Sequence, residues 1–186
     1  MNRLYTSRHV ALALAALALH AHPPLRKNEL VRITGLPWSA IQRAVASLKE
    51  RELLEIHTSK GYESYEIRPA TPYMPAIRLA ALVDGGIIEA LSPMAARLRF
   101  VMVLGSFAWG HPQAASDIDL LVVGGATRTE VDDALRPLGE RYEREFDVVV
   151  YTDEEMRDRL GRDDYLLRNA ITNGVRIVGS PDLVPA

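Results

Sequence analysis

The chain has 186 residues, 48% hydrophobic and 25% charged, a composition typical of a globular protein with one domain or two small ones. It contains no cysteine, which excludes disulfide bonds and thiolate metal sites and fits a cytoplasmic protein. The net charge of −2 is unevenly distributed, because residues 1–70 carry ten Lys/Arg against six Asp/Glu and the remainder twelve against eighteen. This asymmetry predicts two units with different partners.

Residues 10–19 form an apolar run behind Arg3 and Arg8. The run is too short to cross a bilayer as a helix, which takes about 20 residues. The residues that follow, HAHPP, make a poor signal-peptide cleavage site, although a signal peptide is the alternative interpretation. Because Ala and Leu favour helix, we predict a buried helix ended by Pro23-Pro24 and no membrane partner.

Two further helices and a hairpin are predicted before residue 68. A helix over residues 27–33 precedes Gly35, which suits a left-handed helix end, and Pro37, which suits the first turn of the next helix. That helix, residues 37–51, places the following apolar side chains on one inward face: Ile41, Ala44, Val45 and Leu48. Strands over residues 53–57 and 62–67 flank a polar turn, as in a hairpin.

This order of elements is that of a winged helix-turn-helix, and the segment LRKNELVRITGLPWSAIQRAVASLKERELLEI resembles that family. The resemblance implies that the helix from Pro37 enters the major groove of double-stranded DNA and that the hairpin tip contacts its backbone or minor groove. Arg43 could bond guanine, Gln42 adenine, and Ser39 or Lys60 phosphate. The same side chains suit any solvent-facing helix, and a winged module used only for protein contacts is the alternative.

Residues 69–76 contain three prolines, which exclude a regular helix or a central strand and mark a boundary. Apolar residues over 77–91 then predict helical packing interrupted at Gly85-Gly86. This segment either spans two domains or pairs with a second copy in a homodimer. We therefore predict an α+β protein with a winged domain (1–68), a linker and connecting helix (69–97), and a mixed α/β domain (98–186).

Apolar strands alternate with helices in the last unit, and three aspartates lie on the strands. Thr152 and Glu155, three residues apart, predict a capping box that starts one of these helices. A strand over residues 99–104 ends in Gly105-Ser106, where the turn around 107–110 is expected to present backbone amides to a phosphate. Asp117 and Asp119 project from one face of the next strand, because alternate residues share a face. If a later strand lies alongside, Asp147 completes a three-carboxylate cluster suited to Mg²⁺ or Mn²⁺.

The segment GSFAWGHPQAASDIDLLVV resembles the polymerase-beta-like nucleotidyltransferases, in which a hydrophobic-Gly-Ser turn precedes Asp-hydrophobic-Asp by about ten residues. Phe146-Asp147-Val148 matches that family's later strand, and the resemblance covers residues 98–180. It is nearest to the minimal members, some of which are antitoxins that attach AMP to a toxin. It implies that Asp117, Asp119 and Asp147 hold metal and that Gly105 and Ser106 bind nucleotide. The chain departs from many minimal relatives at Trp109, where they carry arginine.

The resulting hypothesis is a DNA-binding protein whose second domain transfers AMP from ATP, with Mg²⁺, to a protein hydroxyl. An autoregulating antitoxin that modifies a cognate toxin would combine both activities. The alternative is a transcriptional regulator whose second domain binds nucleotide or a partner without turnover, as the loss of a basic residue at Trp109 would favour.

Overall fold

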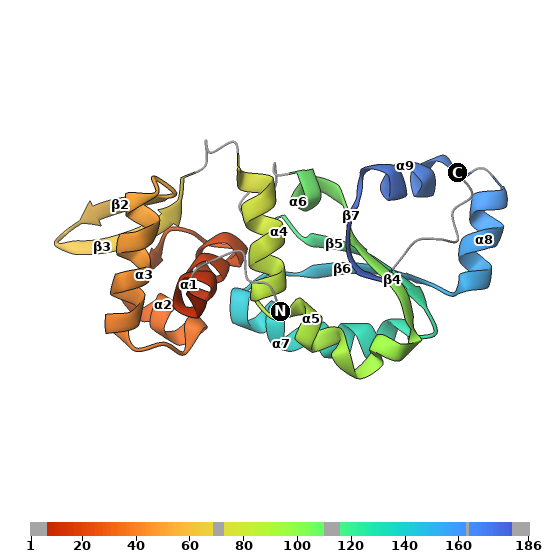
Figure 1. Ribbon diagram of the computed structural model, residues 1–186, viewed down its shortest axis with the longest axis horizontal. Helices are drawn as coiled ribbons and strands as arrows, with labels where there is room; N and C mark the ends of the chain where they lie inside the picture. The colour runs from red at the N-terminus through yellow and green to blue at the C-terminus, as the bar shows by residue number, and fades with distance from the viewer. Residues whose placement is uncertain (1–6, 69–72, 110–115, 163, 180–186) are drawn as a thin grey trace.

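The computed structural model describes residues 7–68, 73–109, 116–162 and 164–179. Helices and strands are mixed along the chain, and the strands form two small sheets toward opposite ends of the molecule (Figure 1). The predicted α+β class is confirmed at this level. Within the described residues, no single helix is long and apolar enough to cross a membrane, although the bent pair Met74–Asp84 and Ile87–Arg97 would pass by length and composition.

The first helix is almost entirely buried, as the run of Ala and Leu predicts. It is capped by Ser7, whose hydroxyl accepts a hydrogen bond from the His9 amide at 3.2 Å. It ends at Leu19, before the two prolines expected to stop it, because His20 is already extended. The elements around it are α1 (Arg8–Leu19), β1 (Leu25–Arg26), α2 (Lys27–Thr34), α3 (Trp38–Glu50), β2 (Leu54–Ser59) and β3 (Tyr62–Ile67).

Helices α2 and α3 are joined by a left-handed glycine, Gly35 (φ 66°), as predicted. The four apolar residues predicted to face inward from α3 are all buried. The hairpin of β2 and β3 is also observed, and β1 adds a third strand through the antiparallel pair Leu25 and Tyr65, giving the order β1-β3-β2. The sequence did not predict β1, which is two residues long.

The connecting helix begins inside the segment predicted to be irregular. Helix α4 (Met74–Asp84) contains Pro75 in its first turn, where no intrahelical N–H is required, so the proline starts the helix instead of preventing it. Residues 69–72 of that segment lie outside the described ones. A break at Gly85-Gly86 precedes α5 (Ile87–Leu91), as predicted. Helix α4 packs on α1 of the same chain, and the short 3-10 helix η1 (Ser92–Arg97) then leads into the second sheet.

The second sheet has the order β6-β5-β4-β7, with β5 and β6 parallel and the other pairs antiparallel. One face packs on a core shared with α1, α4 and α7, and the other packs on α8 and α9. The elements are β4 (Leu98–Val103), α6 (Gly105–Trp109), β5 (Ile118–Gly124), α7 (Arg128–Tyr142), β6 (Phe146–Tyr151), α8 (Asp153–Gly161), α9 (Tyr165–Asn173) and β7 (Val175–Gly179). The predicted capping box of Thr152 and Glu155 starts α8.

A continuous core joins the two ends of the molecule. Leu14 and Leu30, near the first sheet, belong to the same buried cluster as Val103 and Leu138, near the second. The apolar helix α1 lies between α3 and α4, which explains why it is buried on all sides (Figure 1). Residues of all three predicted segments, 1–68, 69–97 and 98–186, contribute to this core. Their division into separate domains stays a prediction.

Candidate active site

The chain turns sharply where β4 gives way to α6. Gly105 begins α6 with φ of 61°, a left-handed conformation that side chains disfavour. The turn predicted over residues 107–110 is wrong for its described part, because this part forms the short helix α6. Burial of Phe107 and Ala108 against the main core explains the helix. Ser106 is half-buried beside Gly105, and Gly110 lies outside the described residues.

Strands β5 and β6 bring two of the predicted aspartates into direct register. The Cα atoms of Asp119 and Asp147 are partners in the parallel ladder, so their side chains leave the sheet side by side on one face. The face is the one that packs on α8 and α9, because Leu121 and Val123 of β5 point into that cluster. Asp147 is nevertheless exposed and Asp119 only half-buried, so both carboxylates lie where this packing stops.

Asp119 is the electrostatically perturbed member of the group. Burial raises its pKa, and repulsion from Asp147 and then Asp117 raises it further. None of the described Lys or Arg side chains forms an ion pair with any of the three aspartates. The cluster therefore combines negative charge and partial burial without an ion-paired cation among the described residues, a repulsion that a bound divalent cation would relieve.

Gly105 lies directly against the Asp119 carboxylate. A Cβ at position 105 would come within 2.1 Å of Asp119 Oδ2, so no side chain fits there without displacing the carboxylate. The Leu104 amide also donates to the Asp119 carbonyl at 2.8 Å, which fixes the end of β4 beside β5. Gly105 and Asp119, both predicted as site residues, thus lie in direct contact, with the Gly105 backbone packed against the carboxylate.

Asp117 completes the group from just outside the sheet. It is exposed and precedes the first residue of β5, Ile118, so the expected strand begins one residue later than Asp117. Its neighbour Ser116 accepts a hydrogen bond from the Arg144 guanidinium through the backbone carbonyl. Asp117 in turn raises the pKa of Arg144, which places this guanidinium within electrostatic reach of the cluster.

The donor set of the cluster is oxygen only, which suits Mg²⁺ or Mn²⁺ better than softer metals. Its three carboxylates are spread more widely than those of a closed metal cage. Among the described residues, the only three potential ligand side chains with atoms all within 4.8 Å of one another are Glu55, His57 and Glu66 of the hairpin. That group is largely exposed and internally paired, since His57 Nε2 lies 2.6 Å from Glu66 Oε1. An open aspartate cluster leaves room for phosphate oxygens as additional ligands.

Trp109 ends α6 and is held by the C-terminal end of α9. Its indole N–H donates to the Asn173 carbonyl at 3.0 Å, and half of the residue is exposed. The side chain is therefore oriented by a specific bond and does not pack inward.

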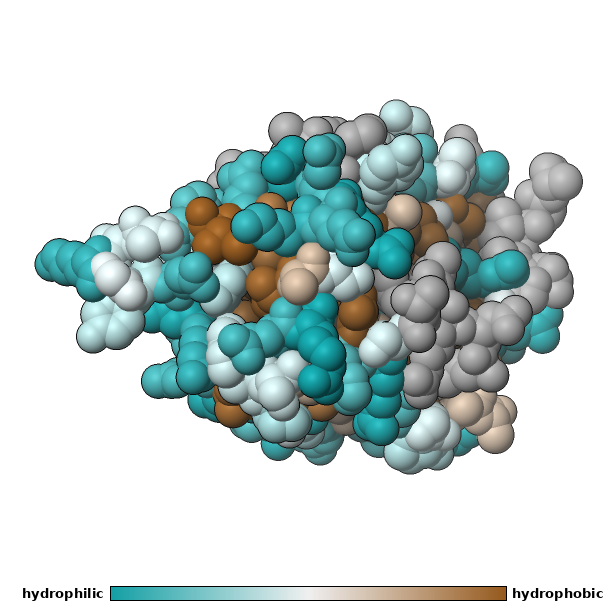
Figure 2. Space-filling view, turned by 60° about the vertical axis from the view of Figure 1, so that its left-hand side comes forward, coloured by the Kyte–Doolittle hydropathy of each residue, from teal (hydrophilic) through white to brown (hydrophobic). Residues whose placement is uncertain are grey.

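The residues predicted to bind DNA lie on the exposed side of the N-terminal part. Gln42 and Arg43 are exposed on α3, Ser39 is exposed in its first turn, and Lys60 is exposed at the tip of the hairpin. The tip is far from the second sheet, and hydrophilic side chains cover most of the face around it (Figures 1 and 2). Helix α3 and the hairpin thus lie together at one end of the molecule.

Arg144 was not predicted as part of any site. It is 7% exposed and donates to three backbone carbonyls, two of them at the end of α1. The sequence offers no local signal for this burial, because Arg144 lies between Glu143 and Glu145 at a helix end and resembles an ordinary surface residue.

Comparison with protein-family models, with curated proteins and with solved structures finds no match to this chain.

Proposed function

We propose that residues 98–186 form a minimal nucleotidyltransferase that transfers AMP from ATP to a hydroxyl group on a protein. The observation that carries the proposal is the group of Gly105, Asp119 and Asp147, in which the Gly105 backbone abuts the Asp119 carboxylate and Asp119 is in register with Asp147 on the neighbouring strand. The N-terminal part, with α3 and the hairpin exposed together, would be a winged helix-turn-helix that binds double-stranded DNA. An antitoxin that modifies its toxin and regulates its own operon would use both parts.

The cluster fits a metal-bound triphosphate in charge, because its three carboxylates have no ion-paired cation among the described residues. Asp117 and Asp119 would hold Mg²⁺, with Asp147 as a third ligand on the acceptor side. When bound, Mg²⁺ supplies charge neutralisation for the triphosphate and for the departing pyrophosphate. The lack of a Cβ at Gly105 leaves room for the Asp119 carboxylate against the backbone, where the metal-bound nucleotide would lie, and the Ser106 hydroxyl is one residue away.

The transfer step assigns separate tasks to the residues. The acceptor oxygen forms a bond to the α-phosphorus as the bond to the bridging oxygen breaks, and pyrophosphate leaves. The hydroxyl proton passes to Asp147, the most accessible carboxylate on the sheet face, which acts as general base. Asp119 is held between Gly105 and the strand pair of β5 and β6, so its oxygens would keep a fixed position relative to the reacting phosphate.

The decisive experiment measures Mg²⁺–ATP binding by calorimetry for the wild type and for Asp117→Asn combined with Asp119→Asn. We expect the double variant to fold and to lose binding, since both side chains lie at the open end of a strand. Asp133→Asn, which removes an exposed carboxylate on α7, is the matched control. Unchanged affinity in the double variant would refute the assignment of the metal site.

A second candidate, a nucleotide sensor without turnover, is favoured by Trp109. Its bond to the Asn173 carbonyl places an indole where minimal relatives carry a basic residue that could hold triphosphate. Transfer is tested with ATP labelled at the α-phosphate and either a cognate toxin or cell lysate as acceptor. Tight Mg²⁺–ATP binding by the wild type without labelling of any acceptor would select the sensor over the enzyme.

A further inference from the structure

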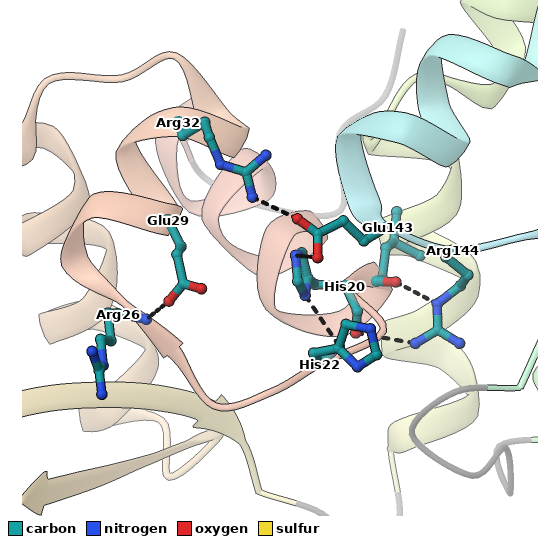
Figure 3. Close-up of polar contacts among 8 residues, drawn as sticks. His20, His22, Arg26, Glu29, Arg32, Glu143 and Arg144 are labelled. Atoms are coloured by element: carbon teal, nitrogen blue, oxygen red, sulfur yellow. Dashed lines mark hydrogen bonds and ion pairs between the residues drawn. The ribbon is translucent and has the colours of Figure 1, made fainter.

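Arg144 is a buried charged residue that contacts both the end of α1 and the segment before β5. It follows α7, and its guanidinium donates to the Leu19 carbonyl, to the His20 carbonyl at 3.1 Å and to the Ser116 carbonyl (Figure 3 shows the contact with His20). Residues 19 and 20 end α1, whereas Ser116 directly precedes Asp117 of the aspartate cluster. One rigid planar group therefore connects the N-terminal part to the candidate active site.

The chemistry of a helix end explains why an arginine lies here. The last carbonyls of α1 have no intrahelical donors, and a cation at a helix C-terminus complements its dipole. Burial of the charged guanidinium nevertheless costs free energy. Burial, and to a lesser extent repulsion from Arg78, lower the pKa of Arg144 to about 10, although Asp117 opposes both effects. The guanidinium is stable in this position only while the carbonyls on both sides remain in place.

The residues next to Arg144 hold α1 on one side and β5 on the other. The Ala21 amide donates to the Tyr142 carbonyl at 3.1 Å, and Glu143 accepts from Arg32 at 2.9 Å and lies 3.6 Å from His20 (Figure 3). Toward the site, the Ile118 amide donates to the Glu145 carbonyl at 3.0 Å. Residues 142–145 thus form a short bridge with contacts at both ends.

We propose that Arg144 is a positioning residue that couples the docking of α1 to the aspartate cluster. It holds the Ser116 carbonyl, and through it the backbone of Asp117, as long as the end of α1 supplies its other two acceptors. This inference rests on the proposed nucleotide site. Mg²⁺–ATP binding and α1 docking then reinforce each other, and by linkage each strengthens the other by the same factor. A change at the nucleotide site would reach the module that carries α3 and the hairpin.

The test combines amide hydrogen exchange with calorimetry on the full chain, using Mg²⁺–ATP. The Ala21 amide reports the docked end of α1. The Leu53 amide, which donates to the Leu48 carbonyl at 3.0 Å within the same module, is the internal control. We expect Mg²⁺–ATP to slow exchange at Ala21 by about 5- to 150-fold, the usual range of allosteric coupling, and to leave Leu53 unchanged.

Arg144→Lys keeps the charge but lacks the planar fork, so it cannot hold three carbonyls at once. It should lose the effect of Mg²⁺–ATP on Ala21 and bind Mg²⁺–ATP more weakly by the same factor. Arg136→Lys, at an exposed position on α7, should behave like the wild type. A purely structural role would lower stability without changing the response of Ala21.

Two results would overturn the coupling. If the wild type binds Mg²⁺–ATP in calorimetry but Ala21 exchange does not change, the coupling is absent and the nucleotide site stands. If the wild type does not bind Mg²⁺–ATP, the proposed function and the coupling both fail. Should Arg144→Lys not fold, the wild-type exchange measurement decides alone.

Discussion

Gly105→Ala tests the contact on which the candidate site depends. The new methyl group would stand 2.1 Å from Asp119 Oδ2, whereas real Cβ contacts stay beyond 3.0 Å. The carboxylate must therefore shift by about 1 Å, a displacement that can cost roughly 100-fold in catalysis. The obstacle is the end of a side chain and not backbone, so the fold itself can adapt. We expect Mg²⁺–ATP binding and transfer to fall by about two powers of ten.

The substitution also places alanine in a left-handed conformation, at a cost of roughly 1–2 kcal/mol. For a chain of this size each kcal/mol lowers Tm by about 2–4 °C. Gly35→Ala is the matched control, because Gly35 has nearly the same conformation, with φ of 66° against 61°, and no atom within 4 Å of the added Cβ. The two variants should lose similar stability, and only Gly105→Ala should lose nucleotide binding.

Thermal melts and calorimetry on both variants separate the two effects. Wild-type Mg²⁺–ATP affinity in Gly105→Ala would show that Asp119 does not need its observed position, and the proposed site would be wrong. An equal loss of affinity in Gly35→Ala would assign the effect to general strain and would equally contradict the reasoning.

Four other substitutions test separate parts of the molecule. Asp147→Asn should keep most Mg²⁺–ATP affinity yet slow transfer by about 10²–10⁴-fold, as expected for loss of a general base; equal labelling would remove Asp147 from the chemistry. Asp119→Asn should raise Tm at pH 7, because the raised pKa in the folded state means that the ionised carboxylate opposes folding; an unchanged Tm would contradict this. In His20→Gln, the free energy of unfolding should fall less steeply below pH 6.5, because burial lowers the pKa of His20 and the unfolded chain takes up the proton first; parallel pH profiles would argue against it. Arg43→Ala should weaken binding to its upstream DNA by about 1–3 kcal/mol if Arg43 contacts a base, with affinity that falls with salt; a gel shift without sequence preference would leave a protein-contact module.

Local patterns predicted the elements that local chemistry determines. Helix α3 was predicted from the spacing of its buried residues, and α8 from the capping box of Thr152 and Glu155. The register that pairs Asp119 with Asp147 depends on which strands are neighbours, so the sequence could state it only as a condition. That condition is met, although the cation that would make the cluster a metal site stays a prediction.

The sequence did not predict the features that depend on tertiary contacts. Strand β1 consists of two residues and exists because Leu25 pairs with Tyr65 of the hairpin. Helix α6 looked like a turn because glycines frame it, and the burial of Phe107 is what makes it helical. The contacts of Arg144 form only when the end of α1 lies against it, since two of the three carbonyls that it binds are more than 100 residues away in the chain.

Asp119 of the cluster and Glu130 of α7 differ in their charge partners and in the direction of their pKa shifts. Glu130 is paired with Arg97 at 2.8 Å and capped by Thr127, and these contacts lower its pKa to about 2. Asp119 has neither kind of partner among the described residues, and burial with two neighbouring aspartates raises its pKa. Natural selection for stability alone would favour a neutral side chain in this position. The negative charge of Asp119 is explained if a cation arrives with a ligand and relieves the repulsion among the aspartates. The free energy that the repulsion costs the free protein is then regained on binding, which raises the affinity for that ligand.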